Sequence, residues 1–261
     1  MPDSTDEMTI TPPFGYGEIA TLQKTDRVLL PSRNSTPEFC RAINALAVSA
    51  GEFNAASRDY PIVFSSPDNG GSFAPVIVLG INEGQNLFVD AGGEWDKGCY
   101  LPAFVRRYPF CISKLYVDGQ PRSERLVCVV KAYIDAQGFA LFDESGQTTA
   151  QWQAIERLLQ GYEDDLDATA QMCAILAKLE LFSPFKFEVL HEQKTMLTVQ
   201  GMYRIDEAKF MDLKPASLKA LVTKGLMGRI YAHMISLERF GNLYSRAEDR
   251  ARRHTTTTVK T

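Results

Sequence analysis

Residues that carry metal and redox chemistry are scarce in this sequence. It has three histidines, and its five cysteines include no C-x-x-C pair. An odd number of cysteines without such a pair predicts neither a disulfide framework nor a structural zinc site. We therefore expect buried free thiols, which are typical of a reducing compartment.

Export and membrane signals are also missing. The chain begins Met-Pro-Asp-Ser-Thr-Asp-Glu, which is acidic and lacks the apolar core of a signal peptide. No apolar run is long enough to span a bilayer. We expect a cytoplasmic protein without a transmembrane segment.

The overall charge does not indicate a polyanionic partner. The net charge is −4, so neither nucleic acid nor an anionic membrane is expected as the main partner. The charge is uneven, because residues 204–253 carry eleven Lys and Arg against six Asp and Glu. This basic region could face an acidic partner or offset the acidic remainder within one fold.

The helices predicted on either side of Gly225 are arranged like a helix-turn-helix. A recognition helix needs several polar side chains that reach base edges. Leu226–Leu237 is instead apolar over a broad face and holds one arginine, Arg229. We therefore expect no nucleic acid partner.

Strand patterns fill the middle of the chain and helix patterns its C-terminal half. Short β-branched runs separated by turn residues predict antiparallel meanders between residues 62 and 142. A hairpin is expected over 185–203, and amphipathic spacing predicts helices over 150–160, 168–181, 215–224 and 226–239. The predicted fold class is α+β, with antiparallel β-meanders packed against a helical C-terminal half.

The two meanders resemble each other. Tyr60-Pro61 and Tyr108-Pro109 each precede an apolar run, and Asn86–Gly93 matches Ala140–Gln147 in turn chemistry. We interpret them as two copies of one unit, joined by the Tyr100–Phe110 stretch. Chance resemblance between short strands and turns is the alternative.

The remaining segments complete the predicted organisation. Residues 1–17 are expected to be a flexible arm, 18–245 a single domain, and 246–261 a disordered tail. The spacing of apolar residues predicts a short helix over Pro37–Ala50. Gly161 and Gly241 are expected to interrupt or end helices.

The stretch Tyr100-Leu-Pro-Ala-Phe-Val-Arg-Arg-Tyr-Pro-Phe110 is the most conspicuous candidate site. Pro102 is typical of a first helical turn and Pro109 of a helix end, which places Arg106 and Arg107 at the C-terminus of a short helix. These arginines could form ion pairs with nearby acids, or they could bind a carboxylate or phosphate in a bidentate manner.

A ligand-binding surface is the functional interpretation of this region. Aromatic rings and guanidinium groups together can hold a peptide or a carboxylated ligand. The expected ligand-binding residues are Trp95, Tyr100, Arg106, Arg107 and Tyr108. The structural alternative, which we favour, is that the aromatics form the core between the two β units.

A metal site is the enzymatic alternative. A mononuclear iron centre needs two histidines and a carboxylate, which His191, His233 and Asp206 could supply. No H-x-D or H-E-x-x-H spacing supports such a centre. A histidine on an apolar helix face, such as His233, is more often a core residue with satisfied hydrogen bonds.

Several segments, in order, resemble the bacterial SapC family over nearly the whole chain. They are Glu52-Phe53, Tyr60-Pro-Ile-Val-Phe64, Gln85-Asn-Leu-Phe88, Trp95, the Tyr100–Phe110 stretch, Leu141-Phe142, Gly146, Gly201-Met-Tyr-Arg-Ile-Asp-Glu207, Gly225 and Tyr231-Ala-His-Met-Ile-Ser-Leu237. The resemblance implies a link to surface-layer formation and to bacterial uptake. It also implies partners such as outer-membrane uptake receptors, halogenase-like flavoproteins and cupin-type oxygenases, but it supplies no catalytic residues.

Two functional hypotheses follow from these observations. The first is a non-catalytic cytoplasmic accessory or binding protein of a cell-envelope or uptake system, without a cofactor. Its contact surface would be the aromatic and arginine residues around Tyr100–Phe110. The second is an iron-dependent enzyme of the oxygenase type. The missing export signal argues against a role as a surface-layer subunit.

Overall fold

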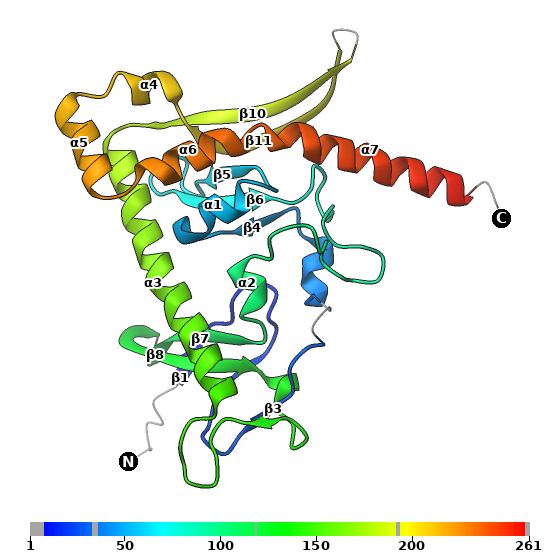
Figure 1. The fold of residues 1–261 in the computed structure, drawn as a ribbon, viewed down its shortest axis with the longest axis vertical. Coiled ribbons are helices and arrows are strands. Elements are labelled where there is room, and N and C mark those ends of the chain that lie inside the picture. The colour runs from blue at the N-terminus through cyan, green and yellow to red at the C-terminus, as the bar shows by residue number, and fades with distance from the viewer. Residues whose placement is uncertain (1–7, 33–35, 118, 192–193, 259–261) are drawn as a thin grey trace. The chain divides into compact units, whose positions relative to one another are not determined.

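The structure is a computed structural model that describes residues 8–32, 36–117, 119–191 and 194–258 (Figure 1). The chain divides into two compact units. Unit 1 comprises Met1–Cys40 and Val105–Glu163, and unit 2 comprises Arg41–Phe104 and Asp164–Thr261. Antiparallel sheets together with a helical C-terminal region confirm the predicted α+β class.

Unit 1 is built on a four-stranded antiparallel sheet with the order β1-β7-β8-β2. Two short strands, β3 and β9, form a second pair. The buried side chains of its core are Val28, Phe110, Val129, Leu141, Trp152 and Leu159. The strands are β1 (Met8–Ile10), β2 (Ile19–Thr21), β3 (Arg27–Val28), β7 (Phe110–Val117), β8 (Gln120–Val130) and β9 (Phe139–Ala140), followed by the 3₁₀ helix η3 (Lys131–Tyr133).

Unit 2 is built on a five-stranded sheet with the order β10-β11-β5-β6-β4. The predicted hairpin is confirmed as β10 (Phe182–His191) and β11 (Lys194–Ile205), and its turn residues 192–193 lie outside the described residues. The other elements are β4 (Ala45–Ala47), β5 (Ile62–Ser65), β6 (Ala74–Val78), η2 (Ala50–Glu52), α1 (Phe53–Ala56), α4 (Glu207–Met211), α5 (Pro215–Thr223), α6 (Met227–Ser236) and α7 (Arg239–Thr258).

Three elements contribute residues to both units. These are η1 (Glu38–Ala42), α2 (Ala103–Arg106) and the 29-residue helix α3 (Ala150–Lys178). The prediction that Gly161 interrupts this helix is wrong. Glycine costs only about 1 kcal/mol inside a helix, and the buried Leu159 and Tyr162 on either side of it pack within unit 1.

The predicted repeat is visible in the strand pairing of the two units. Strands β7, β8 and β2 lie in the same order as β5, β6 and β4. The Tyr-Pro dipeptides begin equivalent hairpins, because the Val130 N–H donates to the Pro109 carbonyl as the Val78 N–H donates to that of Pro61. Phe110 then pairs with Val129 as Ile62 pairs with Ile77.

The third strand of each copy has the same register. Ile19 faces Val130 in unit 1, and Ala45 faces Val78 in unit 2. The ladder continues with Leu22 N–H donating to the Val127 carbonyl and, equivalently, Val48 N–H donating to the Pro75 carbonyl. Register is set by which face of a strand is buried, so this agreement supports a common three-strand unit.

The closing turns of the two copies also correspond. In each, an aspartate N–H and carbonyl close the turn, and a glycine with positive φ follows three residues later: Asp90 with Gly93 (φ 85°), and Asp143 with Gly146 (φ 80°). The predicted alignment of Asn86 with Ala140 is therefore wrong by one residue. The hydrogen bonds align Asp90 with Asp143.

Local predictions differ from the structure at three places. Residues 37–50 form η1 and β4 in place of one helix, because pairing with β6 overrides the weak helical spacing. Met8–Ile10 of the expected arm pairs with β7. Helix α7 continues through Gly241 and extends to Thr258, where a disordered tail was expected from residue 246. The single domain expected over residues 18–245 remains a prediction beside the two compact units.

The two equivalent turn glycines provide a matched test of the repeat. An alanine at Gly146 would meet no neighbouring atom, whereas its Cβ at Gly93 would collide with the Arg41 guanidinium. Arg41 donates to the carbonyls of Ala91 and Gly92. We expect Gly146→Ala to lower the free energy of unfolding by about 1 kcal/mol through left-handed backbone strain. Gly93→Ala should cost about 1 kcal/mol more, through the lost hydrogen bonds.

Urea denaturation would measure both losses. In an Arg41→Ala background the collision is gone, so the two glycine substitutions should then cost the same. Equal losses in the wild-type background would contradict this account.

Candidate functional site

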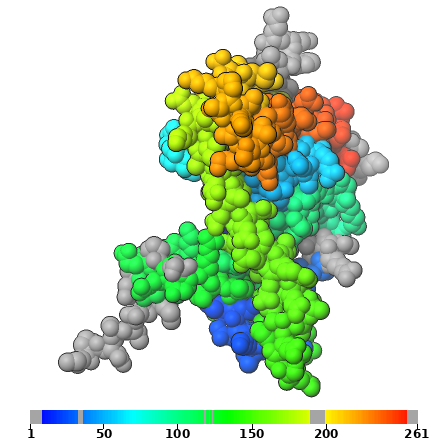
Figure 2. Space-filling view, turned by 60° about the vertical axis from the view of Figure 1, so that its left-hand side comes forward, coloured from blue at the N-terminus to red at the C-terminus, as the bar shows by residue number. Residues whose placement is uncertain are grey.

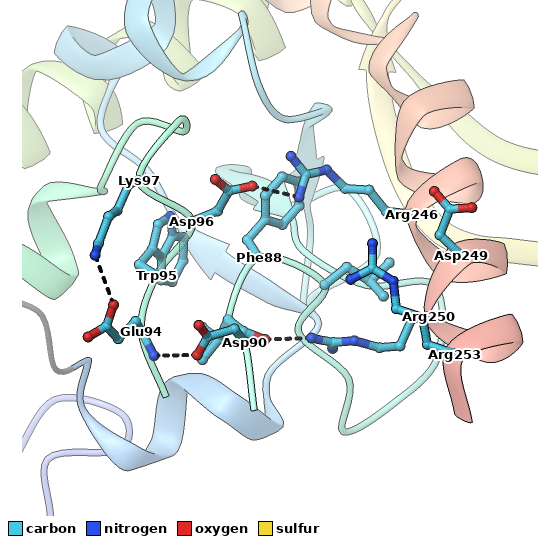
Figure 3. Close-up of a pocket in the computed structure, with 12 residues that line it drawn as sticks. Phe88, Asp90, Glu94, Trp95, Asp96, Lys97, Arg246, Asp249, Arg250 and Arg253 are labelled. Atoms are coloured by element: carbon cyan, nitrogen blue, oxygen red, sulfur yellow. Dashed lines mark hydrogen bonds and ion pairs between the residues drawn. The ribbon is translucent and has the colours of Figure 1, made fainter. Parts of the chain in front are cut away.

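A cleft of about 480 Å³ in unit 2 contains one of the predicted ligand-binding residues, Trp95 (Figure 3). We call it the Trp95 cleft. One wall is the loop of residues 87–97, and the other is one side of α7. The charged side chains of the loop wall are Asp90, Glu94, Asp96 and Lys97, and those of the helix wall are Arg246, Asp249, Arg250 and Arg253.

The loop wall is held by its closing turn. Asp90 accepts a hydrogen bond from the Glu94 backbone N–H through Oδ1 at 2.9 Å. Arg41 fastens the tip of the turn through the carbonyls of Ala91 and Gly92, at 3.2 and 3.1 Å. The loop wall therefore has a defined shape before any ligand binds.

The helix wall follows from the spacing of its arginines. Arg246, Arg250 and Arg253 recur at i, i+4 and i+7, which places them on one face of α7. Arg250 donates to the carbonyls of Asn86 and Val89, at 2.6 and 2.5 Å. This bidentate contact fastens the helix to the loop.

Arg246 makes the second attachment between the two walls. It donates to Asp96 Oδ2 at 2.9 Å, and its guanidinium lies 4.4 Å from the centroid of the Phe88 ring. A hydrogen bond from the Gly98 backbone N–H, and then the Arg246 contact, lower the pKa of Asp96. Asp96 is therefore charged at neutral pH, and this attachment weakens only in acid.

Trp95 is fixed in orientation by buried polar contacts. Its Nε1 donates to the Tyr60 hydroxyl at 2.9 Å, and that hydroxyl donates to the Tyr100 carbonyl. Only 7% of the Trp95 surface is exposed. The indole therefore forms a small apolar part of the cleft, in a position set by Tyr60.

The cleft lining is electrically balanced, with four acidic and four basic side chains. Lys97 is 74% exposed and forms an ion pair with Glu94 at 3.2 Å. Exposed pairs of this kind contribute little to stability, so they can exchange partners at low cost. The arrangement can therefore bind a ligand that carries both charges.

Tyr100 has a structural environment outside the cleft. Its hydroxyl donates to Glu52 Oε1 at 3.0 Å, and its backbone N–H donates to Asp59. Glu52 is buried and also accepts hydrogen bonds from the backbone N–H groups of Ser49 and Ala103. Tyr100 is thus part of a buried network that satisfies this carboxylate.

Arg106, Arg107 and Tyr108 belong to unit 1, whereas Trp95 and Tyr100 belong to unit 2. Arg107 is 5% exposed and lies 4.4 Å from the Tyr162 ring and 3.8 Å from Glu163. This environment matches the structural alternative, in which the arginine pairs with a nearby acid.

The neighbours of Arg107 differ from each other in exposure. Tyr108 packs against Tyr16 and Tyr133, and burial raises its pKa above the usual range. Arg106 is exposed. A ligand-binding role for this group remains a prediction.

His233 lies on α6, and its ring is buried against strands β11 and β5. Its Nε2 accepts a hydrogen bond from the Ile205 backbone N–H at 3.0 Å. Nδ1 must then carry the proton, and it donates to the Ile62 carbonyl at 2.9 Å. Both ring nitrogens are therefore used by backbone groups, which leaves no lone pair for a metal.

The other residues of the predicted iron site have different surroundings. Asp206 is the N-cap of α4 and accepts from the Lys209 backbone N–H. The side chain of His191 lies outside the described residues. Among the described residues, no group of three His, Cys, Asp or Glu side chains could hold a metal ion.

The α7 arginines are not among the residues predicted from the sequence, because the composition of residues 246–261 predicts a disordered tail. Their i, i+4, i+7 spacing was the available signal. The buried Leu243, about one turn before Arg246, and the buried Phe240, nearly two turns before it, belong to the same helix. The segment is highly charged, and such a composition favours a prediction of disorder over one of a helix.

Comparison with known families identifies the chain. A family model described as SapC matches residues 28–243. The chain belongs to the SapC family. No curated protein and no solved structure matches it. The SapC match includes the loop wall of the Trp95 cleft and ends before Arg246.

Within the described ranges of this SapC-family chain, no helix is sufficiently long and apolar to cross a bilayer.

The buried His233 should make stability depend on pH. Burial lowers its pKa from 6.5 to about 4. Between these values the unfolded chain binds a proton that the folded chain does not, so stability falls as the pH falls. Over this range we expect a loss of about 3 kcal/mol.

Urea unfolding across this pH range would measure the effect. His233→Gln removes the titrating group and should give a shallower dependence than the wild type. Parallel curves for the two proteins would contradict a neutral, buried His233.

Proposed function

We propose that this SapC-family protein is a non-catalytic binding protein and that the Trp95 cleft holds a short peptide segment with a free carboxylate. The observation that carries this proposal is the lining of the cleft, in which opposite charges surround an oriented indole. The cleft volume lies within the usual range of ligand sites. A short peptide carries a charge of each sign at its termini and can place an apolar side chain against the indole, which suits such a lining.

The exposed cations are the parts of the cleft that would meet the carboxylate. Arg246 and Arg250 already join α7 to the loop. Lys97 and Arg253 are exposed at the two walls. We assign carboxylate recognition to Lys97 and Arg253, and the positioning of α7 to Arg246 and Arg250.

A second surface of unit 2 supports a protein as the source of the peptide. Helices α4, α5 and α6 lie together on one face (Figure 2). They expose five large apolar side chains, namely Met211, Leu218, Val222, Tyr231 and Ile235. Residues 213–237, which cover α5 and α6, include four Lys and Arg and no Asp or Glu, whereas α4 and the residue after it add Lys209 against Glu207 and Asp212. Exposed apolar groups beside cations suit an acidic protein surface.

The cellular role belongs to the same proposal. The SapC membership and the resemblance described above support an accessory role in a bacterial cell-envelope or uptake system. The cytoplasmic location that we propose with it rests on the sequence alone. Uptake receptors and oxygenase- or halogenase-type proteins are the partner classes to test first. This assignment rests on the family, whereas the peptide site rests on the geometry of the cleft.

Fluorescence of Trp95 would test the peptide site. The chain has two tryptophans, so Trp152→Phe leaves Trp95 as the single reporter. The probes are synthetic tetrapeptides with free or amidated C-termini. We expect a saturable change with the free acids, weakened about tenfold by Lys97→Ala or Arg253→Ala, which corresponds to ~1.4 kcal/mol.

Lys186→Ala is the matched control, because Lys186 is also an exposed lysine paired with a glutamate, Glu188, at 2.8 Å. It should leave the affinity unchanged. A response without saturation, or an equal loss with Lys186→Ala, would refute the proposed site.

A further inference from the structure

Unit 1 contains a row of three reactive side chains across neighbouring strands. Cys111 on β7 lies directly opposite Cys128 on β8, and Cys128 lies directly opposite Thr21 on β2. Directly opposed residues point to the same face of a sheet. Both thiols are therefore neighbours on one face, and both are fully buried.

The pairing geometry is compatible with a disulfide. The Val130 N–H bonds to the Pro109 carbonyl, and hydrogen-bonded pairs alternate along an antiparallel ladder, so Cys111 and Cys128 form the next such pair. The Cα atoms of such a pair are about 5.5 Å apart, which is near the preferred separation in disulfides. The two thiols already form a hydrogen bond with each other, and the Cβ atoms must approach by up to about 1 Å for the S–S bond to form.

The two thiols have different acidities. A hydrogen bond donated by Cys111 lowers the pKa of Cys128, and one from Thr21 lowers it further, while burial opposes both. The same bond, together with burial, raises the pKa of Cys111. Burial raises the pKa of Cys40, Cys99 and Cys173.

The second copy of the repeat shows that the fold does not require this chemistry. The register places Val63 opposite Val76, and Val76 opposite Ala47, at the equivalent positions. The same row is therefore entirely apolar in unit 2. The two adjacent thiols and the hydroxyl of unit 1 are therefore not needed to form the three-strand unit that both copies share.

We propose that Cys111 and Cys128 are a redox-active dithiol that a small hydroperoxide oxidises reversibly to a cross-strand disulfide. The Cys128 thiolate attacks the peroxide, becomes a sulfenic acid and releases hydroxide when hydrogen peroxide is the oxidant. Cys111 then attacks the sulfenic sulfur, which forms the S–S bond and releases water. A dithiol reductant reverses the reaction by thiol–disulfide exchange.

Access to the buried thiols requires a small oxidant. Arg107, Glu163, Tyr16 and Tyr162 are the titratable groups around this row, since each interacts electrostatically with Cys111 or with another member of the group. Hydrogen peroxide is close to water in size, so a local opening of this cover suffices.

Peptide mapping after peroxide treatment tests the proposal in the folded full-length protein. Trypsin cleaves after Arg107, Lys114, Arg125 and Lys131, which separates the Cys111 and Cys128 peptides unless a disulfide joins them. After free thiols are blocked with N-ethylmaleimide, we expect residues 108–114 linked to residues 126–131. The intact protein should lose about 2 Da, and a dithiol reductant should reverse both changes.

Two variants make the result specific. Cys111→Val with Cys128→Val copies the row of unit 2, so it should fold and give no linked peptide. Cys111→Ser should leave a sulfenic acid on Cys128 that dimedone traps. If peroxide oxidises Cys99 but forms no linked pair, or if Cys40 and Cys173 form crosslinks to the same extent, the proposal is wrong.

Discussion

The His233 ring takes the place of a backbone hydrogen bond between two strands of unit 2. Strand β11 pairs with β5 at Tyr203 and Phe64, and the same register would bring Ile205 opposite Ile62. The imidazole stands between them, accepting from one backbone and donating to the other. Ser236 on the next turn of α6 accepts from the Ile62 N–H. One helix face thus satisfies buried backbone groups that the strands leave unpaired, and it fixes α6 on the sheet.

The repeat explains how one frame carries different chemistry in its two copies. The strands agree in order and register, and the closing turns agree in their hydrogen bonds. The differences lie in the side chains placed on this frame. After the turn, Asp96 receives Arg246 from α7, whereas its equivalent Thr149 precedes α3. Across the strands, the row that is apolar in unit 2 carries Cys128 and Cys111 in unit 1. The functions that we propose for the two copies therefore follow from the side chains in which they differ.

Local patterns of the sequence were sufficient for the fold class, the β10–β11 hairpin, α5 and the matching Tyr-Pro segments. They failed where a distant partner decides the structure. Strand β4 forms because β6 lies beside it, and no property of Ala45–Ala47 alone indicates this. For the candidate site, Trp95 was predicted, but its α7 partners follow about 150 residues later in the chain. The burial of Arg107 and the hydrogen bonds of Tyr100 to Glu52 and Asp59 depend on residues that are distant in the sequence, so local patterns do not reveal them.

His233 joins two strands as a neutral ring, and with both ring nitrogens engaged it is not an iron ligand. Its ring ¹⁵N chemical shifts, recorded near pH 6 and therefore well above the folded pKa of about 4, test this most directly. The account predicts one protonated nitrogen, Nδ1, and one unprotonated nitrogen, Nε2, unchanged by added ferrous iron. An imidazolium signal near pH 6, or a shift that saturates with one equivalent of iron, would contradict it.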